Sequence, residues 1–320
     1  MKLPKRLNDL VNRKQEFIDL YRNRLEKTVL KLQSRLLDQI IAEVVSGLDV
    51  KDGIIQDTKY NYRLLADLDK VYSEFTAFSS SVITSQVATA TTGIVDFGRR
   101  YFAMSFSEIP VRFDKIIEAT ASKINLRVGL EGGKIVRGGF LESMIKDNAI
   151  LTDVKNYIAK SVTGQIDRKD FIQGLTKMVS GDTGPGKLEK QYQRFTYDLY
   201  QQYDRAYNNS LADEFKMNYF LYQGGLIEDS RDFCVAHNNK VWTREEAATW
   251  PDWRPSDGVY PEGYVIKQKN KNEVPSYLKV DGYDPLVDFG GPRCRHGISW
   301  ISDELAFRLR PDLKNKSQNT

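Results

Sequence analysis

The sequence predicts an α+β protein whose N-terminal two thirds are mostly helical, with long helices, and whose C-terminal part is a small α+β module of short strands and turns. Two observations predict this fold class. Apolar residues recur every three or four positions over long stretches before about residue 215. From about Leu226 to Ser302, Trp, Pro, Gly and Asp become frequent and the long helical periodicity vanishes.

A long N-terminal helix is the first element. Its apolar positions step by three, four or seven residues, which places them on one stripe of a helix. They are Leu7, Val11, Ile18, Leu25, Val29, Leu32, Leu36, Ile40 and Val44. Pro4 fits the first turn, and Gly47 is a reasonable stop. At about 1.5 Å per residue the helix is ~60 Å long, so we expect it to lie against other helices or other subunits.

A second helical region is expected from about Tyr60 to Phe106. It contains an uncharged stretch, Phe75 to Val95, that approaches the ~20 residues of a membrane-spanning helix. Nine of its positions are Ser or Thr, and hydroxyl groups at that density make membrane insertion poor. The stretch therefore predicts a buried helix whose small side chains let its neighbours approach closely.

The middle of the chain predicts shorter helices. A third helical segment follows Pro110, and paired glycines around Ile135 and Val136 then predict a hairpin or an irregular loop. Helices resume from about Leu141 to Met178. The next stretch, "GDTGPGKL", matches the first seven places of a phosphate-binding P-loop, but Leu188 stands where the motif needs a hydroxyl. It is predicted to be a flexible linker between helices.

An aromatic amphipathic helix comes next and is expected to end at Gly224 and Gly225. Its stripe comprises Tyr192, Phe195, Leu199, Tyr203, Tyr207, Leu211 and Phe215. In the module that follows, "GYVIKQKN" and "SYLKVDGYDPLVDF" are predicted as strands broken by turn residues. The chain is thus divided into a long-helix region 1–107, a helical middle region 108–222 with a linker near 180–187, and a C-terminal module 223–320.

The composition limits the class of protein. The chain is 41% hydrophobic and 28% charged, with a net charge of +4, as expected for a soluble, foldable protein. The N-terminus has no apolar segment typical of a secretory signal, which predicts a cytoplasmic, reducing compartment. Through Leu36 there are ten Lys or Arg against four Asp or Glu, and the C-terminal tail is basic too. Such segments fit contact with phosphates or an acidic protein surface, or simply a solvated surface.

All cysteines and histidines of the chain fall into two short clusters, Cys234 with His237 and Cys294 with His296. Zinc prefers four tetrahedral thiolate or imidazole ligands, and a closed Cys2His2 set of this kind is usually structural. We therefore expect a zinc ion that holds the beginning and end of the C-terminal module together. Packing without a metal and a disulfide between Cys234 and Cys294 remain the alternatives.

Two segments of the module resemble a known family. "EDSRDFCVAHNNKVWTREEA" and, later, "GGPRCRHGISW" are similar to the C-terminal motif of the Mu F-like minor head proteins of tailed bacteriophages. Asp229, Arg231, Cys234, Lys240, Val241 and Trp242 match its first part, and Pro292, Cys294, Arg295 and His296 its last. The chain departs from the pattern where His296 replaces a final Cys and where a His before the Pro is missing.

The resemblance implies a virion component that is not an enzyme. It implies assembly with the portal protein or the major capsid protein, in multiple copies per particle, and a part in packaging or ejection of DNA. Its location is then the head or portal region, reached from the host cytoplasm. The alternative from a different class is a metal-dependent nuclease, suggested by "HNN" beside the Cys/His cluster and by the basic segments. A nucleotide-driven machine using "GDTGPGKL" is a third option.

Overall fold

The computed structural model describes residues 2–196 and 198–317. The expected fold class is confirmed: long helices form the N-terminal part, and a small antiparallel sheet lies near the C-terminus. The chain forms two compact units. Unit 1 comprises Met1–Ile18, Thr91–Ile124 and Asp198–Thr320, and unit 2 comprises Asp19–Ala90 and Asn125–Tyr197.

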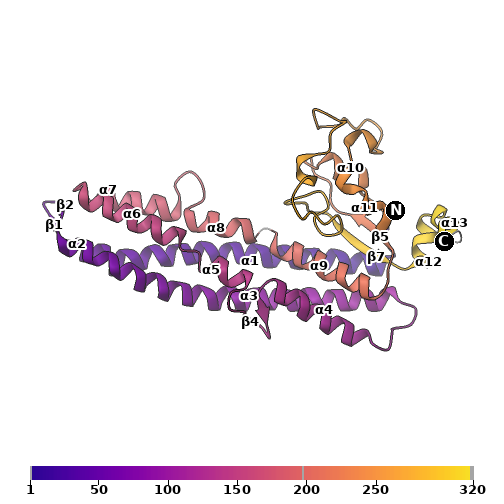
Figure 1. Cartoon of the computed structure of the whole chain (residues 1–320), viewed down its shortest axis with the longest axis horizontal. Coiled ribbons are helices and arrows are strands. Elements are labelled where there is room, and N and C mark those ends of the chain that lie inside the picture. The colour runs from indigo at the N-terminus through magenta and orange to yellow at the C-terminus, as the bar shows by residue number, and fades with distance from the viewer. Residues whose placement is uncertain (1, 197, 318–320) are drawn as a thin grey trace. The chain divides into compact units, whose positions relative to one another are not determined.

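The helices of the described residues are labelled in Figure 1 where there is room. They are α1 (Lys5–Glu43), α2 (Lys59–Arg63), α3 (Asp67–Ser105), α4 (Phe113–Arg127), α5 (Phe140–Ile145), α6 (Ala149–Thr163), α7 (Arg168–Ser180), α8 (Lys187–Thr196), α9 (Leu199–Glu214), α10 (Asp232–His237), α11 (Arg244–Ala248), α12 (Asp303–Leu309) and α13 (Asp312–Ser317). The strands are β1 (Val50–Lys51), β2 (Ile54–Ile55), β3 (Leu130–Glu131), β4 (Lys134–Ile135), β5 (Tyr219–Gln223), β6 (Lys240–Thr243) and β7 (Gly297–Ile301).

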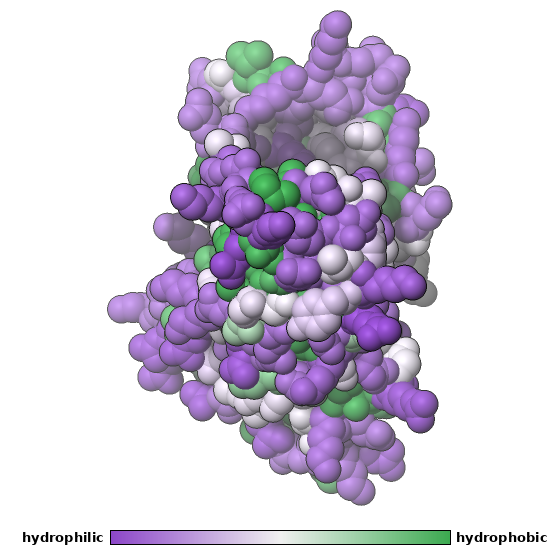
Figure 2. Space-filling model, turned by 90° about the vertical axis from the view of Figure 1, so that its left-hand side faces the viewer, coloured by the Kyte–Doolittle hydropathy of each residue, from purple (hydrophilic) through white to green (hydrophobic). Residues whose placement is uncertain are grey.

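The core of unit 2 is built from buried residues of α1, α3, α6, α7 and α8. Within this unit the predicted stripe of α1 is buried at Leu25, Val29, Leu32, Leu36 and Ile40. Leu36 and Ile40 share an apolar contact region with residues of α3 and α6. The apolar stripe therefore faces other helices of the same chain. The surface in Figure 2 is mostly hydrophilic, with some hydrophobic residues among the polar ones.

The Ser/Thr-rich stretch Phe75 to Val95 lies inside α3, but only one face of it is buried, whereas residues such as Phe78 and Ser81 are exposed. Ile83, Val87 and Ala90 have no exposed surface in unit 2. Close approach of a neighbour is visible in unit 1, where a Cβ atom on Gly93 would meet the ring of Phe17 at 2.2 Å. Among the described helices, none combines the length and apolarity that crossing a membrane requires.

Two turn regions of unit 2 agree with the sequence. The paired glycines Gly132 and Gly133 take positive φ angles of 53° and 76° and join β3 to β4 in an antiparallel hairpin. The stretch "GDTGPGKL" joins α7 to α8, with Lys187 paired to Asp153 and Leu188 buried. A P-loop lies between a strand and a helix and needs its lysine for phosphate, so the structure favours the linker interpretation.

The sheet of unit 1 has the order β6-β5-β7, and both pairings are antiparallel. β5 is the central strand, with Phe220 opposite Trp242 on β6 and opposite Trp300 on β7. Phe220, Tyr222 and Trp300 are almost completely buried. This sheet is the scaffold that positions the Cys/His residues.

The strand predictions for the C-terminal module were wrong. "GYVIKQKN" and "SYLKVDGYDPLVDF" contain turns and one short 3-10 helix (Ser276–Leu278), and no strand is formed there. Their apolar residues Val265 and Val280 are exposed by 80% and 51%, so these positions give no buried side chain that would stabilise a strand.

The aromatic helix also ends earlier than predicted. α9 stops at Glu214, and the chain then enters β5. Lys216 takes a φ of 54°, the Met217 N–H donates to the Ala212 carbonyl, and the Lys216 N–H donates to the Asp213 carbonyl. This is a Schellman ending made without glycine. The predicted stripe is divided between two helices: Tyr192 on α8 is buried, and the side chain of Phe195 on the same helix lies outside the described residues. The stripe positions on α9 are buried: Leu199, Tyr203, Tyr207 and Leu211.

The two compact units do not coincide with the three regions that were predicted along the chain. Each unit combines separate stretches of sequence, and the long helices α1 and α3 contribute to both. The limit predicted at 222/223 falls inside β5. The regions 1–107, 108–222 and 223–320 stay a prediction.

Candidate metal centre

The first cysteine is carried by α10, a helix of six residues that follows an extended Arg231. Asp232 in its first turn anchors the loop opposite. Its carboxylate accepts hydrogen bonds from the main-chain N–H groups of Lys267 and Gln268 at 2.9 Å and from the Tyr264 hydroxyl at 2.7 Å. The segment "GYVIKQKN", which was predicted as a strand, is thus held at the start of α10. Cys234, two residues further along this helix, is buried.

The second cysteine lies in the tight loop "GGPRC" before β7. Gly291 and Arg293 take positive φ angles of 84° and 61°, which folds the loop sharply toward α10. The Arg231 guanidinium donates to the Gly290 carbonyl and, at 2.7 Å, to the Pro292 carbonyl. Arg231 and the two main-chain carbonyls therefore join the segment of the first cysteine to that of the second.

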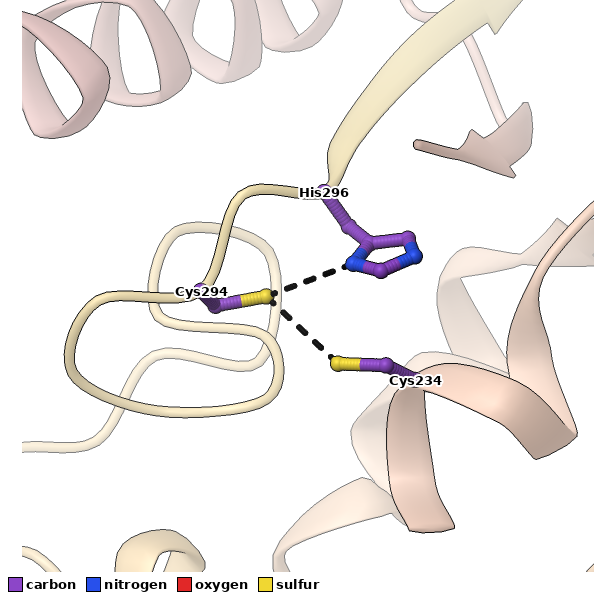
Figure 3. Close-up of side chains that lie close together, drawn as sticks. All are labelled: Cys234, Cys294 and His296. Carbon is purple, nitrogen blue, oxygen red and sulfur yellow. Dashed lines mark hydrogen bonds between the residues drawn. The ribbon is translucent and has the colours of Figure 1, made fainter. Parts of the chain in front are cut away.

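Cys234, Cys294 and His296 converge in one buried group that could hold a metal ion (Figure 3). The two Sγ atoms are 3.7 Å apart, and Cys294 Sγ lies 3.9 Å from His296 Nδ1. Cys294 and His296 are two residues apart in an extended segment, and both point into the group as predicted. The site joins α10 to the segment that leads into β7.

The distances fit a metal better than a disulfide. Tetrahedral zinc with Zn–S of about 2.3 Å and Zn–N of about 2.0–2.1 Å separates two sulfurs by about 3.8 Å and a sulfur from a nitrogen by about 3.5 Å. A disulfide needs about 2.05 Å between sulfurs, and both cysteines are free. His296 Nε2 is buried without a hydrogen-bond partner, so the contact of the ring with Cys294 Sγ is made through Nδ1.

His237 does not join this group. Its Nδ1–H donates to the Phe233 carbonyl at 2.7 Å, and its ring stacks on the Phe233 ring at 3.9 Å between centroids. Trp242 and Trp250 lie within 5 Å of the His237 ring centroid. Burial lowers the pKa of His237 to about 3. The side chain is thus a neutral member of an aromatic cluster, and the predicted set of four ligands is reduced to three.

The pKa values of the two thiols are shifted in opposite directions. Cys234 donates toward Cys294, which lowers the pKa of the Cys294 thiol well below its ordinary value, and His296 and Arg205 add to this effect. The same hydrogen bond and burial raise the pKa of Cys234. A bound cation would replace the thiol protons.

Two residues that the sequence did not indicate complete the surroundings. The Arg205 guanidinium, on α9, donates to the carbonyls of Cys294 and His296 and lies 4.5 Å from the Phe289 ring centroid. The Tyr222 hydroxyl, on β5, donates to Cys234 Sγ at 3.5 Å and lies 3.8 Å from Cys294 Sγ. Neither position has a sequence pattern that distinguishes it from the other aromatic and basic residues of these elements.

A comparison of the chain with known proteins finds no matching family model, no matching curated protein and no matching solved structure. Two thiolates and one imidazole are borderline-soft donors suited to zinc and to other late transition metals rather than to magnesium or calcium.

Proposed function

We propose that this chain is a structural minor head protein of a tailed bacteriophage, acting in head morphogenesis and in packaging or ejection of DNA, without catalysis of its own. One observation carries the proposal. Three of the four Cys and His residues in the two segments that resemble the Mu F-like family come together in a buried group. Residues far apart in the sequence, from both of these segments, thus share one site.

The metal in this proposal is zinc, in a structural role. A catalytic zinc keeps a position open to water or substrate, whereas Cys234, Cys294 and His296 are each no more than 6% exposed. The segments that carry them are the beginning and the end of a module with few regular elements. A metal that joins such segments adds its binding free energy to folding.

The nuclease alternative gains little from the geometry. A nuclease needs a general base that can reach its substrate. His237 is 2% exposed, its Nδ1–H is bonded to a main-chain carbonyl, and its pKa is lowered to about 3. His296 is 3% exposed beside the two thiols. Neither histidine is placed to take a proton from water at a phosphodiester.

The proposed partners are the portal protein, the major capsid protein or both, with multiple copies of the chain per particle. The apolar stripe of α1 is used within the chain, so partner contacts would use the outer faces of the helices. On α1, the exposed residues Arg24, Lys27, Lys31 and Arg35 have no acidic partner among the described residues. These cations suit contact with packaged DNA.

The test is the composition of particles of the phage that encodes the chain. Purified heads are analysed by mass spectrometry, and the chain is located by cryo-electron microscopy. We expect it at the portal or the inner capsid surface of the virion, after assembly in the host cytoplasm. Purified chain should leave plasmid DNA intact in the presence of magnesium. Absence of the chain from heads, or cleavage that His237→Asn abolishes, would contradict the proposal.

A further inference from the structure

Three ligands leave one corner of a tetrahedral metal site to be filled, and the Tyr222 hydroxyl lies close to both sulfurs. Tyr222 on β5 is fully buried. Its hydroxyl oxygen lies 3.5 Å from Cys234 Sγ and 3.8 Å from Cys294 Sγ. Around zinc, an oxygen ligand at about 2.0 Å stands about 3.5 Å from a sulfur ligand. The hydroxyl thus has the spacing of a ligand from both sulfurs.

The four polar atoms have similar separations. Four of these separations run from 3.5 Å between Tyr222 and Cys234 to 3.9 Å between Cys294 and His296, with 3.7 Å between the sulfurs. His237, the residue expected at this corner, is held by the Phe233 carbonyl. We propose that Tyr222 supplies the fourth donor atom, so that the metal is held by two sulfurs, one nitrogen and one oxygen.

The surroundings keep the Tyr222 ring in place. The ring lies parallel to that of His296, with 5.2 Å between centroids and an interplanar angle of 9°. It meets Phe233, Trp250 and Phe289 edge-on at 5.8 to 6.0 Å. Such contacts restrict the ring to one orientation, and β5 is the central strand of the sheet. The oxygen is therefore positioned by rigid structure, as a ligand must be.

Without the metal, the hydroxyl donates its hydrogen to Cys234 Sγ. When a divalent cation enters, the protons that remain on the thiols and on this hydroxyl leave to solvent, and the cation takes their place. A tyrosine at the fourth corner also closes the site to water. This inference rests on the metal centre of the proposed function and specifies its donor set.

The experiment compares the whole chain with Tyr222→Phe and with a matched control, Tyr207→Phe. Tyr207 is also completely buried in unit 1, but its hydroxyl has no hydrogen-bond partner. Both variants keep the aromatic ring. Zinc affinity is measured by competition with a chelator, and Co²⁺ is used as a spectroscopic probe of the ligands. We expect Tyr222→Phe to weaken zinc binding ~10-fold to 100-fold and to change the Co²⁺ absorption spectrum. Tyr207→Phe should change neither the zinc affinity nor the spectrum.

A second measurement uses the unmodified chain, in case Tyr222→Phe does not fold. Addition of zinc should produce the near-ultraviolet absorption change of a tyrosine that loses its hydroxyl proton to a metal. Unchanged affinity and an unchanged Co²⁺ spectrum in Tyr222→Phe would overturn the inference, as would a zinc-loaded chain without the tyrosine absorption change. A wild-type chain that takes up no metal would overturn the metal centre itself.

Discussion

Nη2 of Arg205 lies 2.8 Å from the carbonyl oxygen of His296 and donates a hydrogen bond to it. The same guanidinium donates to the carbonyls of Cys294 and Val287. Arg205 is 5% exposed, so α9 holds the main chain on both sides of the second cysteine through one buried cation. The shape of the "GGPRC" loop thus depends on a residue about 90 positions earlier in the chain.

Arg205→Met should therefore loosen this loop. The substitution keeps most of the aliphatic volume but leaves three carbonyls without their donor, at a cost of about 3 kcal/mol in the free energy of unfolding. Hydrogen exchange should rise between residues 287 and 296. Arg100→Met is the control, because Arg100 makes only an exposed pair with Asp96, worth at most about 1 kcal/mol. Equal stability of the two variants would contradict this role of Arg205.

The helical part of the fold could be predicted because the sequence features that determine it lie within a few residues of one another. The apolar period of α1, the glycine pair between β3 and β4, and the glycine-rich linker before Lys187 each specify their structure within a few residues. The end of α9 could not be predicted, because Lys216 takes the left-handed conformation that normally favours glycine. The positions of the strands in the module could not be predicted either. They depend on which face of the sheet is buried, and residues far away in the sequence determine that face.

The candidate site was predicted only in part for the same reason. The spacing of Cys294 and His296 in an extended segment was sufficient to place both side chains together. Cys234 and His237 lie on one short helix, but the aromatic cluster of Phe233 and Trp250 holds the imidazole. Tyr222 reaches the site because β5 is the central strand, a fact of topology that no local pattern contains.

Gly290→Ala should disrupt the metal centre through one added methyl group. A Cβ atom at this position would lie 3.4 Å from Cys294 Sγ and only 2.7 Å from Cys234 Sγ, and the second distance is closer than a methyl group and a sulfur can approach. Overpacking of this kind costs about 1–3 kcal/mol and displaces a ligand atom. Gly225→Ala is the control, because a Cβ atom there meets nothing within 4 Å. Zinc content of both variants checks the prediction, which fails if Gly290→Ala retains a full equivalent.

Cys294→Ser should remove the metal. The purified chain should contain about one equivalent of zinc by elemental analysis, and the variant almost none, because a serine hydroxyl is a poor replacement for a thiolate. We expect the module after about Leu226 to lose stability, since metal binding contributes to folding in small modules. The helices of unit 2 should remain, because their buried stripe makes no contribution to the site. A native chain free of metal, or a Cys294→Ser variant as stable as the parent, would contradict the zinc interpretation.

His237 should make the stability of the chain depend on pH. Burial lowers the pKa of the folded imidazole to about 3, whereas an unfolded histidine titrates near pH ~6.5. Between these values the unfolded state binds more protons than the folded state, so stability is complete above pH ~6.5 and falls as the pH decreases toward ~3. The loss amounts to a few kcal/mol, because one pKa unit corresponds to about 1.4 kcal/mol.

His237→Asn isolates this effect. An asparagine amide can take the position of Nδ1 and donate to the Phe233 carbonyl, but it does not titrate. The variant should be less stable than the parent at neutral pH, because it loses the stacking on Phe233. It should also lose less stability on acidification, and it should keep its zinc, because His237 lies outside the group of ligands. Denaturant unfolding at pH 7 and pH 5 gives the comparison. Both proteins release metal to acid in the same way, so the difference between their slopes reports His237 alone, and equal slopes would show that the imidazole is not buried in its neutral form.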